Sequence, residues 1–242
     1  MSVKISDEMR ALWEVRDNPA HGVWKVRRRL ASAMRLVIER LTTSDAPEEE
    51  LVIVAVRLEE YAERLGEHPR RRRYDGFSEA AVADPDEVKK TEGGAHFDFS
   101  PLIGQSNPLA PPIVISSDDE GVQGDVVFGA AYEGPPGCVH GGCIAAAFDE
   151  VLGYTQTFSG QPGMTGTLET VYRAPTPLHT PLVFRAQIDR ISGRKVICKG
   201  TLSAGDQLCA ESTGIFIQLK PGKILALEAA REEREDKRLM LS

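Results

Sequence analysis

The sequence predicts an α+β protein in which a helical N-terminal part precedes an antiparallel sheet built around one central helix. Three patterns predict this class. Apolar residues recur at helical spacing between residues 23 and 65, a compact apolar run follows Gly141-Gly142, and β-rich segments with glycine-containing turns fill residues 165–219. We expect residues 1–95 to form a helical arm and linker, 96–220 one sheet domain, and 221–242 a helical tail.

The arm is expected to be a helical hairpin. Apolar residues from Val23 to Leu41 recur at intervals of three and four, with arginines on the other faces. The stretch Asp45-Ala-Pro47-Glu48 is typical of a capped helix start, and Leu51 through Leu65 gives a second helix that ends near Gly66. Two amphipathic helices of this kind need another surface to pack against. A loop-like segment, residues 77–94, follows them.

The sheet domain is expected to begin with a strand over residues 125–132, followed by a helix that starts near His140. Strands are then predicted at residues 165–173, 182–191, 194–203 and 207–219, joined by turns at residues 192–193 and 204–206. Alternating apolar residues predict one buried face in the second of these, at Leu182, Phe184, Ala186 and Ile188. We therefore expect an antiparallel meander after the helix, and a charged terminal helix over residues 224–241.

Composition restricts the possible functions. The net charge of −7 and the pI of about 5.4 argue against general affinity for nucleic acid or anionic membranes. Four cysteines show neither a CxxC pair nor zinc-ligand spacing, so no structural metal and no metal cofactor are expected. The first nine residues are too charged for a signal peptide, and no apolar stretch reaches the roughly 20 residues of a membrane span. We expect a soluble cytoplasmic protein without a membrane segment.

The most informative segment is His140-Gly141-Gly142, with Asp149 nine residues after the histidine. Prolines and glycines keep residues 134–139 out of a helix, so a helix begins at the glycine pair with unpaired N–H groups and a positive dipole end. Those amides can hold the oxygen of a polarised carbonyl, and Asp149, about two and a half turns along, can return toward the same side. An alternative remains open: the glycines permit tight packing, Asp149 and Glu150 begin a solvated face, and His140 is a loop histidine.

These residues, together with Met164-Thr165 and Tyr172-Arg-Ala-Pro175, resemble the hotdog-fold acyl-CoA thioesterases of the phenylacetate-type (PaaI) and thioesterase-superfamily-member group, which share an HGG motif. The likeness extends from about Asn107 to Leu219. It implies a hotdog fold, a curved antiparallel sheet wrapped on a central helix. It also implies that Asp149 is general base or nucleophile, that the Gly141 amide is the oxyanion donor, and that His140 orients the thioester.

The resemblance further implies an obligate homodimer, often assembled as two such dimers, in which Thr165 reaches Asp149 from the neighbouring subunit. Gly142, Asn107 and Thr167 would line the substrate site. Only one of Asp149 and Glu150 can face the thioester, because neighbours on a helix point about 100° apart, and we favour Asp149. Arg70 to Arg73 is expected to be a solvated linker rather than a grip on coenzyme A phosphates, and His96 is expected to be a loop residue.

The resulting hypothesis is hydrolysis of an acyl-CoA thioester without metal or organic cofactor. No GxSxG motif is present, so a serine hydrolase is not indicated. A second hypothesis is a non-catalytic acyl-CoA sensor, because residues 6–67 are predicted to be helical and an arginine run follows them; the acidic balance and the retained carboxylate argue against DNA binding. A hydratase of the same fold would need a different pairing of Asp and His.

Overall fold

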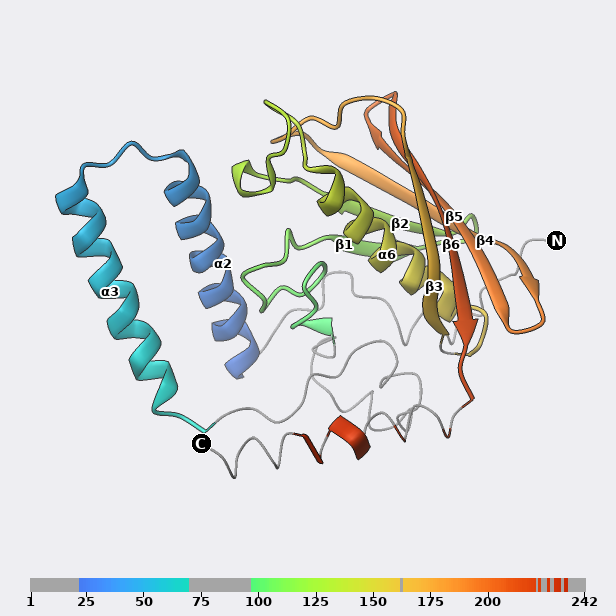
Figure 1. The fold of residues 1–242 in the computed structure, drawn as a ribbon, viewed down its shortest axis with the longest axis horizontal. Helices are drawn as coiled ribbons and strands as arrows, with labels where there is room; N and C mark the ends of the chain where they lie inside the picture. Colours follow the sequence, from blue (N-terminus) through green and yellow to red (C-terminus); the bar gives the residue numbers. More distant parts are fainter. Residues whose placement is uncertain are drawn as a thin grey trace.

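The computed structural model describes residues 22–69, 97–161, 163–220 and a few positions between 222 and 234. Six antiparallel strands form one sheet in the order β1-β2-β4-β5-β6-β3, and helix α6 (Gly141–Thr157) lies across one of its faces (Figure 1). The strands are β1 (Val114–Ser117), β2 (Val122–Val126), β3 (Gly163–Tyr172), β4 (Leu182–Ser192), β5 (Lys195–Ala204) and β6 (Gln207–Gln218). The expected α+β hotdog architecture with N-terminal helices is confirmed.

Helix α6 is the centre of the core because its apolar residues recur at intervals of three and four. Its buried members include Ile144, Ala147, Phe148, Val151 and Leu152. The Phe148 ring meets the ring of Phe184 on β4 edge to face, with centroids 5.0 Å apart. The sheet carries Gly200 beneath the helix, where an added Cβ would come within 3.2 Å of the Leu152 side chain. A missing side chain on the sheet therefore lets α6 approach closely.

The expected meander is confirmed for three strands and is wrong for the fourth. β4, β5 and β6 follow one another as hairpins whose turns place Gly193 and Gly205 at φ of 59° and 56°. β3, in contrast, pairs with β6 at the far edge of the sheet and has no ladder with β4. The segment between β3 and β4 crosses over, so β3 is an edge strand. Local turn signals could not reveal this, because they do not report which edge a strand joins.

The strand expected over residues 125–132 is wrong for most of its length and overlaps β2 only at Asp125 and Val126. β2 ends at Val126, and residues Ala130–Tyr132 form the short 3-10 helix η2. β2 ends where its partner strands end, because Val126 pairs with Leu182, the first residue of β4, and Asp125 pairs with Val114, the first residue of β1. Beyond this point the arm contacts the backbone, since the Glu39 carboxylate accepts a hydrogen bond from the Ala130 N–H at 2.9 Å.

The arm consists of α2 (Gly22–Thr43) and α3 (Glu48–Gly66), as predicted. α2 is attached to the domain by the buried Ala31 and by an ion pair between Arg28 and Asp98 at 2.8 Å. α3 buries none of its residues. The expected cap is wrong in detail, because the N-cap position is Pro47 and no side chain caps the helix.

Several expectations lie outside the described residues: the arginine run at 70–73, the loop at 77–94, His96 and most of the tail beyond 221. Within the described part of the chain, no helix is both long and apolar enough to cross a membrane. Among the same residues, no group of three or more metal-binding side chains comes together.

Candidate active site

The N-terminal end of α6 is set by the loop that precedes it. The Gly134 N–H bonds to the Cys138 carbonyl at 2.9 Å, and Glu133 bridges to Val139. The His140 N–H then bonds to the carbonyl of Tyr132 at 2.8 Å, which fixes the residue that caps the helix. The proline-rich loop thus folds back on itself, and it places His140 in an extended conformation (φ −59°, ψ 131°) directly before the first turn of α6.

The two peptide groups around Gly141 are held almost completely by hydrogen bonds. The Gly142 N–H donates to His140 Nδ1 at 3.0 Å, and the Tyr172 hydroxyl donates to the Gly141 carbonyl at 2.7 Å. The His140 carbonyl accepts from the N–H groups of Cys143 and Ile144. The Gly141 N–H alone in this turn has no partner among the described residues. A single free donor therefore remains at the positive end of the helix dipole.

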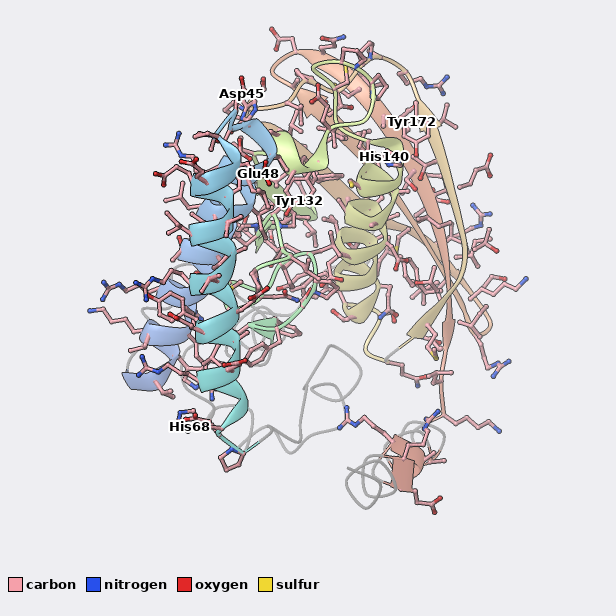
Figure 2. All side chains as sticks on the ribbon, turned by 60° about the vertical axis from the view of Figure 1, so that its left-hand side comes forward. Asp45, Glu48, His68, Tyr132, His140 and Tyr172 are labelled. Carbon is pink, nitrogen blue, oxygen red and sulfur yellow. The ribbon has the colours of Figure 1, made fainter. Side chains whose placement is uncertain are left out.

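The same contacts explain why both positions are glycine and which tautomer His140 adopts. A Cβ on Gly141 would lie 3.3 Å from the hydroxyl of Tyr172, and one on Gly142 would lie 3.1 Å from His140 Nδ1. Figure 2 shows His140 and Tyr172 close together at this end of α6. Because His140 Nδ1 accepts a hydrogen bond, the proton of the neutral ring is on Nε2. That N–H is the second donor at the exposed helix end.

The carboxylate expected to act in catalysis lies further along α6. Asp149 is exposed, and its Oδ1 accepts a hydrogen bond from the Thr165 hydroxyl at 2.8 Å. Thr165 is on β3 of the same chain. The structure therefore corrects the expectation that Thr165 reaches Asp149 from a neighbouring subunit, because the edge position of β3 places it beside α6.

Gly141 and Asp149 of one chain do not converge on one point. Eight residues of α-helix separate them, which is a rise of about 12 Å along the axis, whereas an aspartate side chain reaches only a few ångströms. The expectation that both surround one small volume within a chain is therefore wrong. The number of helical turns determines on which side of the helix a residue lies, but the distance between two residues also depends on the rise along the helix axis. Figure 2 shows His140 at the very end of the helix.

Glu150, the neighbour of Asp149, has a different environment. Its Oε1 accepts a 2.7 Å hydrogen bond from Ser100, whose Oγ also accepts from the N–H groups of Leu102 and Ile103. Burial raises the pKa of Glu150 above its ordinary value, the Ser100 hydrogen bond opposes this, and the charge of Asp149 adds to it. Glu150 thus binds the loop before β1, which leaves Asp149 as the exposed carboxylate of the pair.

Two side chains expected at the substrate site are not brought to it in this chain. Asn107 donates from Nδ2 to the Phe99 carbonyl and accepts the Leu109 N–H, so its amide holds a loop together. Thr167 is separated from Thr165 by a bulge, and pairs with Ile215. Since Thr165 pairs with the buried Phe216, which faces α6, Thr167 lies on the opposite face of the sheet.

Cys143 lies beside the glycine pair but is a poor nucleophile. Burial raises the pKa of its thiol, which keeps the sulfur protonated, and a thiol in this state does not attack a thioester. Sequence reasoning assigned no role to Tyr172 and Ser100, which hold the helix end and Glu150. Tyr172 lies in the Tyr-Arg-Ala-Pro motif, so a signal was present there, whereas nothing in the sequence marks Ser100.

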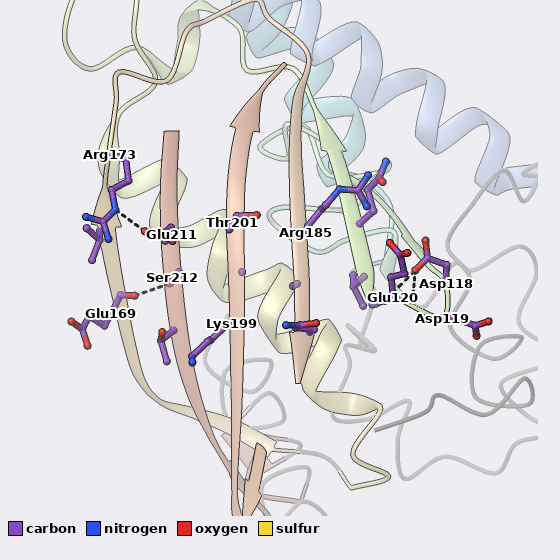
Figure 3. Close-up of a pocket in the computed structure, with 18 residues that line it drawn as sticks. Asp118, Asp119, Glu120, Glu169, Arg173, Arg185, Lys199, Thr201, Glu211 and Ser212 are labelled. Carbon is purple, nitrogen blue, oxygen red and sulfur yellow. Dashed lines mark hydrogen bonds and ion pairs between the residues drawn. The ribbon is translucent and has the colours of Figure 1, made fainter. Parts of the chain in front are cut away.

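A hollow of about 880 Å³ lies on the other face of the sheet, turned away from α6 (Figure 3). Both signs of charge line it, including Arg185, Lys199 and Glu120. Arg173 pairs there with Glu211 at 2.6 Å. Gly141, Asp149 and Thr165 are not part of this hollow, so it is separate from the candidate site.

Known proteins resemble this chain both in sequence and in fold. Residues 136–211 match the model of the thioesterase superfamily. A crystal structure of a thioesterase superfamily protein is 33% identical, covers 79% of this chain and 90% of its own, and superposes with a TM-score of 0.67. Acyl-coenzyme A thioesterase THEM4 of Mus musculus is 38% identical over 99 residues, which is 40% of this chain and 43% of that protein. THEM5 of Homo sapiens is 32% identical over 94 residues, 38% of each chain. The chain thus spans less than half the length of these curated relatives.

Proposed function

Because this chain belongs to the thioesterase superfamily, we propose that it hydrolyses acyl-CoA thioesters to a carboxylic acid and coenzyme A. The observation that carries the proposal is a hydrogen-bonded, exposed carboxylate on the same helix as a free backbone donor. Asp149 is oriented by Thr165 at 2.8 Å, and the Gly141 N–H is unpaired among the described residues. The names of the curated relatives favour the same substrate class.

In the proposed reaction Asp149 removes a proton from a water molecule as the water oxygen bonds to the thioester carbonyl carbon. The carbonyl oxygen becomes an oxyanion, which the Gly141 N–H stabilises by about 2.7–4 kcal/mol if it resembles other single oxyanion donors. Collapse of this intermediate breaks the carbon–sulfur bond, and the departing thiolate takes from Asp149 the proton that the water lost. Direct attack by the carboxylate is the alternative role of Asp149. Thr165 fixes the carboxylate in either case.

The rise of about 12 Å between Gly141 and Asp149 requires two copies of the chain for this chemistry. Two α6 helices related by a twofold axis run antiparallel when the axis is perpendicular to them, and an axis that passes near Ala145, midway between Gly141 and Asp149, brings Gly141 of one copy next to Asp149 of the other. Each dimer then holds two sites. The exposure of Asp149 in one chain, and the free edge of β3 with Met164 and Val171 exposed, are consistent with such an interface.

His140 supplies a second donor in this arrangement. Its Nε2–H is exposed at the helix end, one residue before Gly141, and is suited to hold the thioester oxygen or a polar group of the acyl chain. A non-catalytic acyl-CoA sensor would not need a carboxylate held by Thr165 beside an open donor, so the geometry favours catalysis over sensing.

The test is a panel of short, long, branched and aromatic acyl-CoA thioesters, with release of free thiol as the readout. We expect Asp149→Asn to lower kcat at least about 100-fold, as loss of a general base does elsewhere, while the protein stays folded. Glu150→Gln is the matched control, since it makes the same acid-to-amide change one residue along, and we expect it to retain activity. Absence of thiol release from every substrate, with wild type and Asp149→Asn alike, would contradict the proposal.

A further inference from the structure

The arm exposes far more apolar surface than the rest of the described chain. Thirteen of the twenty-one large hydrophobic side chains exposed in the described residues lie on α2 and α3, which together are the smaller part of it. Val26 is 64% exposed and Ile53 55%. Soluble proteins seldom leave contiguous apolar patches of this kind without a partner. The two helices are therefore incomplete as they stand in one chain.

The two helices have complementary charge. α2 carries six basic side chains and one acidic one, whereas α3 carries six acidic side chains and two basic ones. Two α2 helices, or two α3 helices, would repel each other, and an α2–α3 pair would attract. The charge pattern thus selects α2 as the surface on which an α3 packs.

The exposed side of α2 has the right pattern for such packing. Ala31, Arg28 and Arg35 face the sheet domain, where Arg35 donates to the Asn107 carbonyl at 2.9 Å. The side turned away carries Val26 and Leu30, four residues apart, with further apolar residues at the same spacing. This stripe is defined by Val23, Val26, Leu30, Met34 and Leu41, all exposed.

Within one chain this stripe is not covered by α3. Although only residues 44–47 join the helices, α2 and α3 make few contacts with each other, and they run as separate rods beside the sheet domain in Figure 1. An antiparallel pair with short loops normally packs at 8–10 Å between axes, with its apolar residues buried between the helices. The hairpin is open.

We propose that a second copy of this chain closes the hairpin: α3 of each copy packs on the exposed stripe of α2 in the other, so that the two arms form an intermolecular four-helix bundle. With one twofold axis, this exchange buries the apolar side chains of both helices and places each basic α2 against an acidic α3. It also gives α3 the burial that its own chain does not provide. This interface is independent of the thioester chemistry.

The test is chemical cross-linking of the full-length chain. Ala33 and Ala55 lie near the middle of their helices and are exposed, so antiparallel packing brings them close. The double variant Ala33→Cys/Ala55→Cys is treated with a short bis-maleimide and resolved on a denaturing gel. We expect a dimer-sized product that needs both substitutions. The unaltered chain and each single variant are controls, because the native Cys138 and Cys143 are partly exposed.

A matched pair of charge insertions sharpens this result. In the double-cysteine background we expect Val26→Glu to reduce the dimer-sized product about tenfold, the effect of roughly 1.4 kcal/mol at an interface. Leu36→Glu, placed about 120° round the helix from Leu30, should leave it unchanged. A monomer-sized internal cross-link would show that the hairpin closes within one chain. Either that product, or no cross-link between the helices, would overturn the proposal.

Discussion

Helices α6 and α3 are of similar length but differ in how much of their surface the chain itself covers. More than half of α6 is buried, and β3 holds it at two places, through Tyr172 at Gly141 and through Thr165 at Asp149. α3 has no buried residue and no comparable contact. One helix is thus completed by its own sheet, whereas the other presents its apolar residues to solvent.

The difference indicates why both proposals involve a second copy. The sheet domain buries its core without a partner, whereas Gly141 and Asp149, the groups proposed to act in catalysis, are about 12 Å apart along α6 and would meet only across two helices. In the arm, the proposed partner buries apolar residues that one chain leaves exposed. The second copy would affect activity in the first case and burial of the arm in the second, so different substitutions should distinguish the two effects.

We expect the greatest difference in the free energy of unfolding, between a substitution next to α6 and one on α3. Phe184 is fully buried against Phe148 of α6, and Phe184→Ala should lower the free energy of unfolding by about 3–5 kcal/mol. Val56, 47% exposed on α3, should cost less than about 1 kcal/mol when changed to alanine. Chemical denaturation of dilute protein measures both. Equal losses would mean that α3 is packed within its own chain.

A smaller effect concerns how β3 holds Gly141, the proposed oxyanion donor. Tyr172→Phe removes only the hydroxyl that holds the Gly141 carbonyl, and we expect kcat to fall up to about tenfold with KM unchanged. Tyr132→Phe is the matched control, since it removes a similar 2.8 Å hydrogen bond to the Leu109 carbonyl. An equal fall in kcat for both variants would point to general loosening and would contradict a specific role of Tyr172.

The smallest effect is a pH dependence of stability at Glu150. Burial raises the pKa of this carboxyl above 4.5, so the stability it contributes is present below that pH and is lost as pH rises through the folded-state pKa. Glu150→Gln has no ionisable carboxyl, so its stability does not change with pH at this position. The Tm of Glu150→Gln relative to wild type should therefore increase from about pH 4 to about pH 7. A difference that is constant over this range would contradict the assignment.

The sequence predicted those features that depend on local patterns. The spacing of apolar residues located α2, α3, α6 and the β4–β6 hairpins, and the alternation at Leu182, Phe184 and Ala186 gave the buried face correctly. Ile188, the last of the series, is on the same face and packs against the core, but it is only partly buried. Helix starts and strand faces are properties of a few consecutive residues, so a single sequence contains them.

Features that depend on distant partners were not predictable in this way. The edge position of β3 put Thr165 beside Asp149 of its own chain, and its bulge turned Thr167 to the other face. β2 ends at Val126 because its partner strands β1 and β4 do not extend past it. The separation of Gly141 from Asp149 follows from helix geometry alone, and it is the reason why the proposed site combines two chains.

Each proposed catalytic site combines Gly141 of one copy with Asp149 of another, and complementation between two inactive variants distinguishes this from a site within one chain. Gly141→Pro removes the N–H at a helix position where proline is favoured, after a residue already extended, and Asp149→Asn removes the carboxylate. Each variant alone should be nearly inactive. Co-refolded in equal amounts, they should recover about a quarter of wild-type activity, because half of the dimers are mixed and each has one intact site. A mixture as inactive as its components would rule out sites shared between two copies.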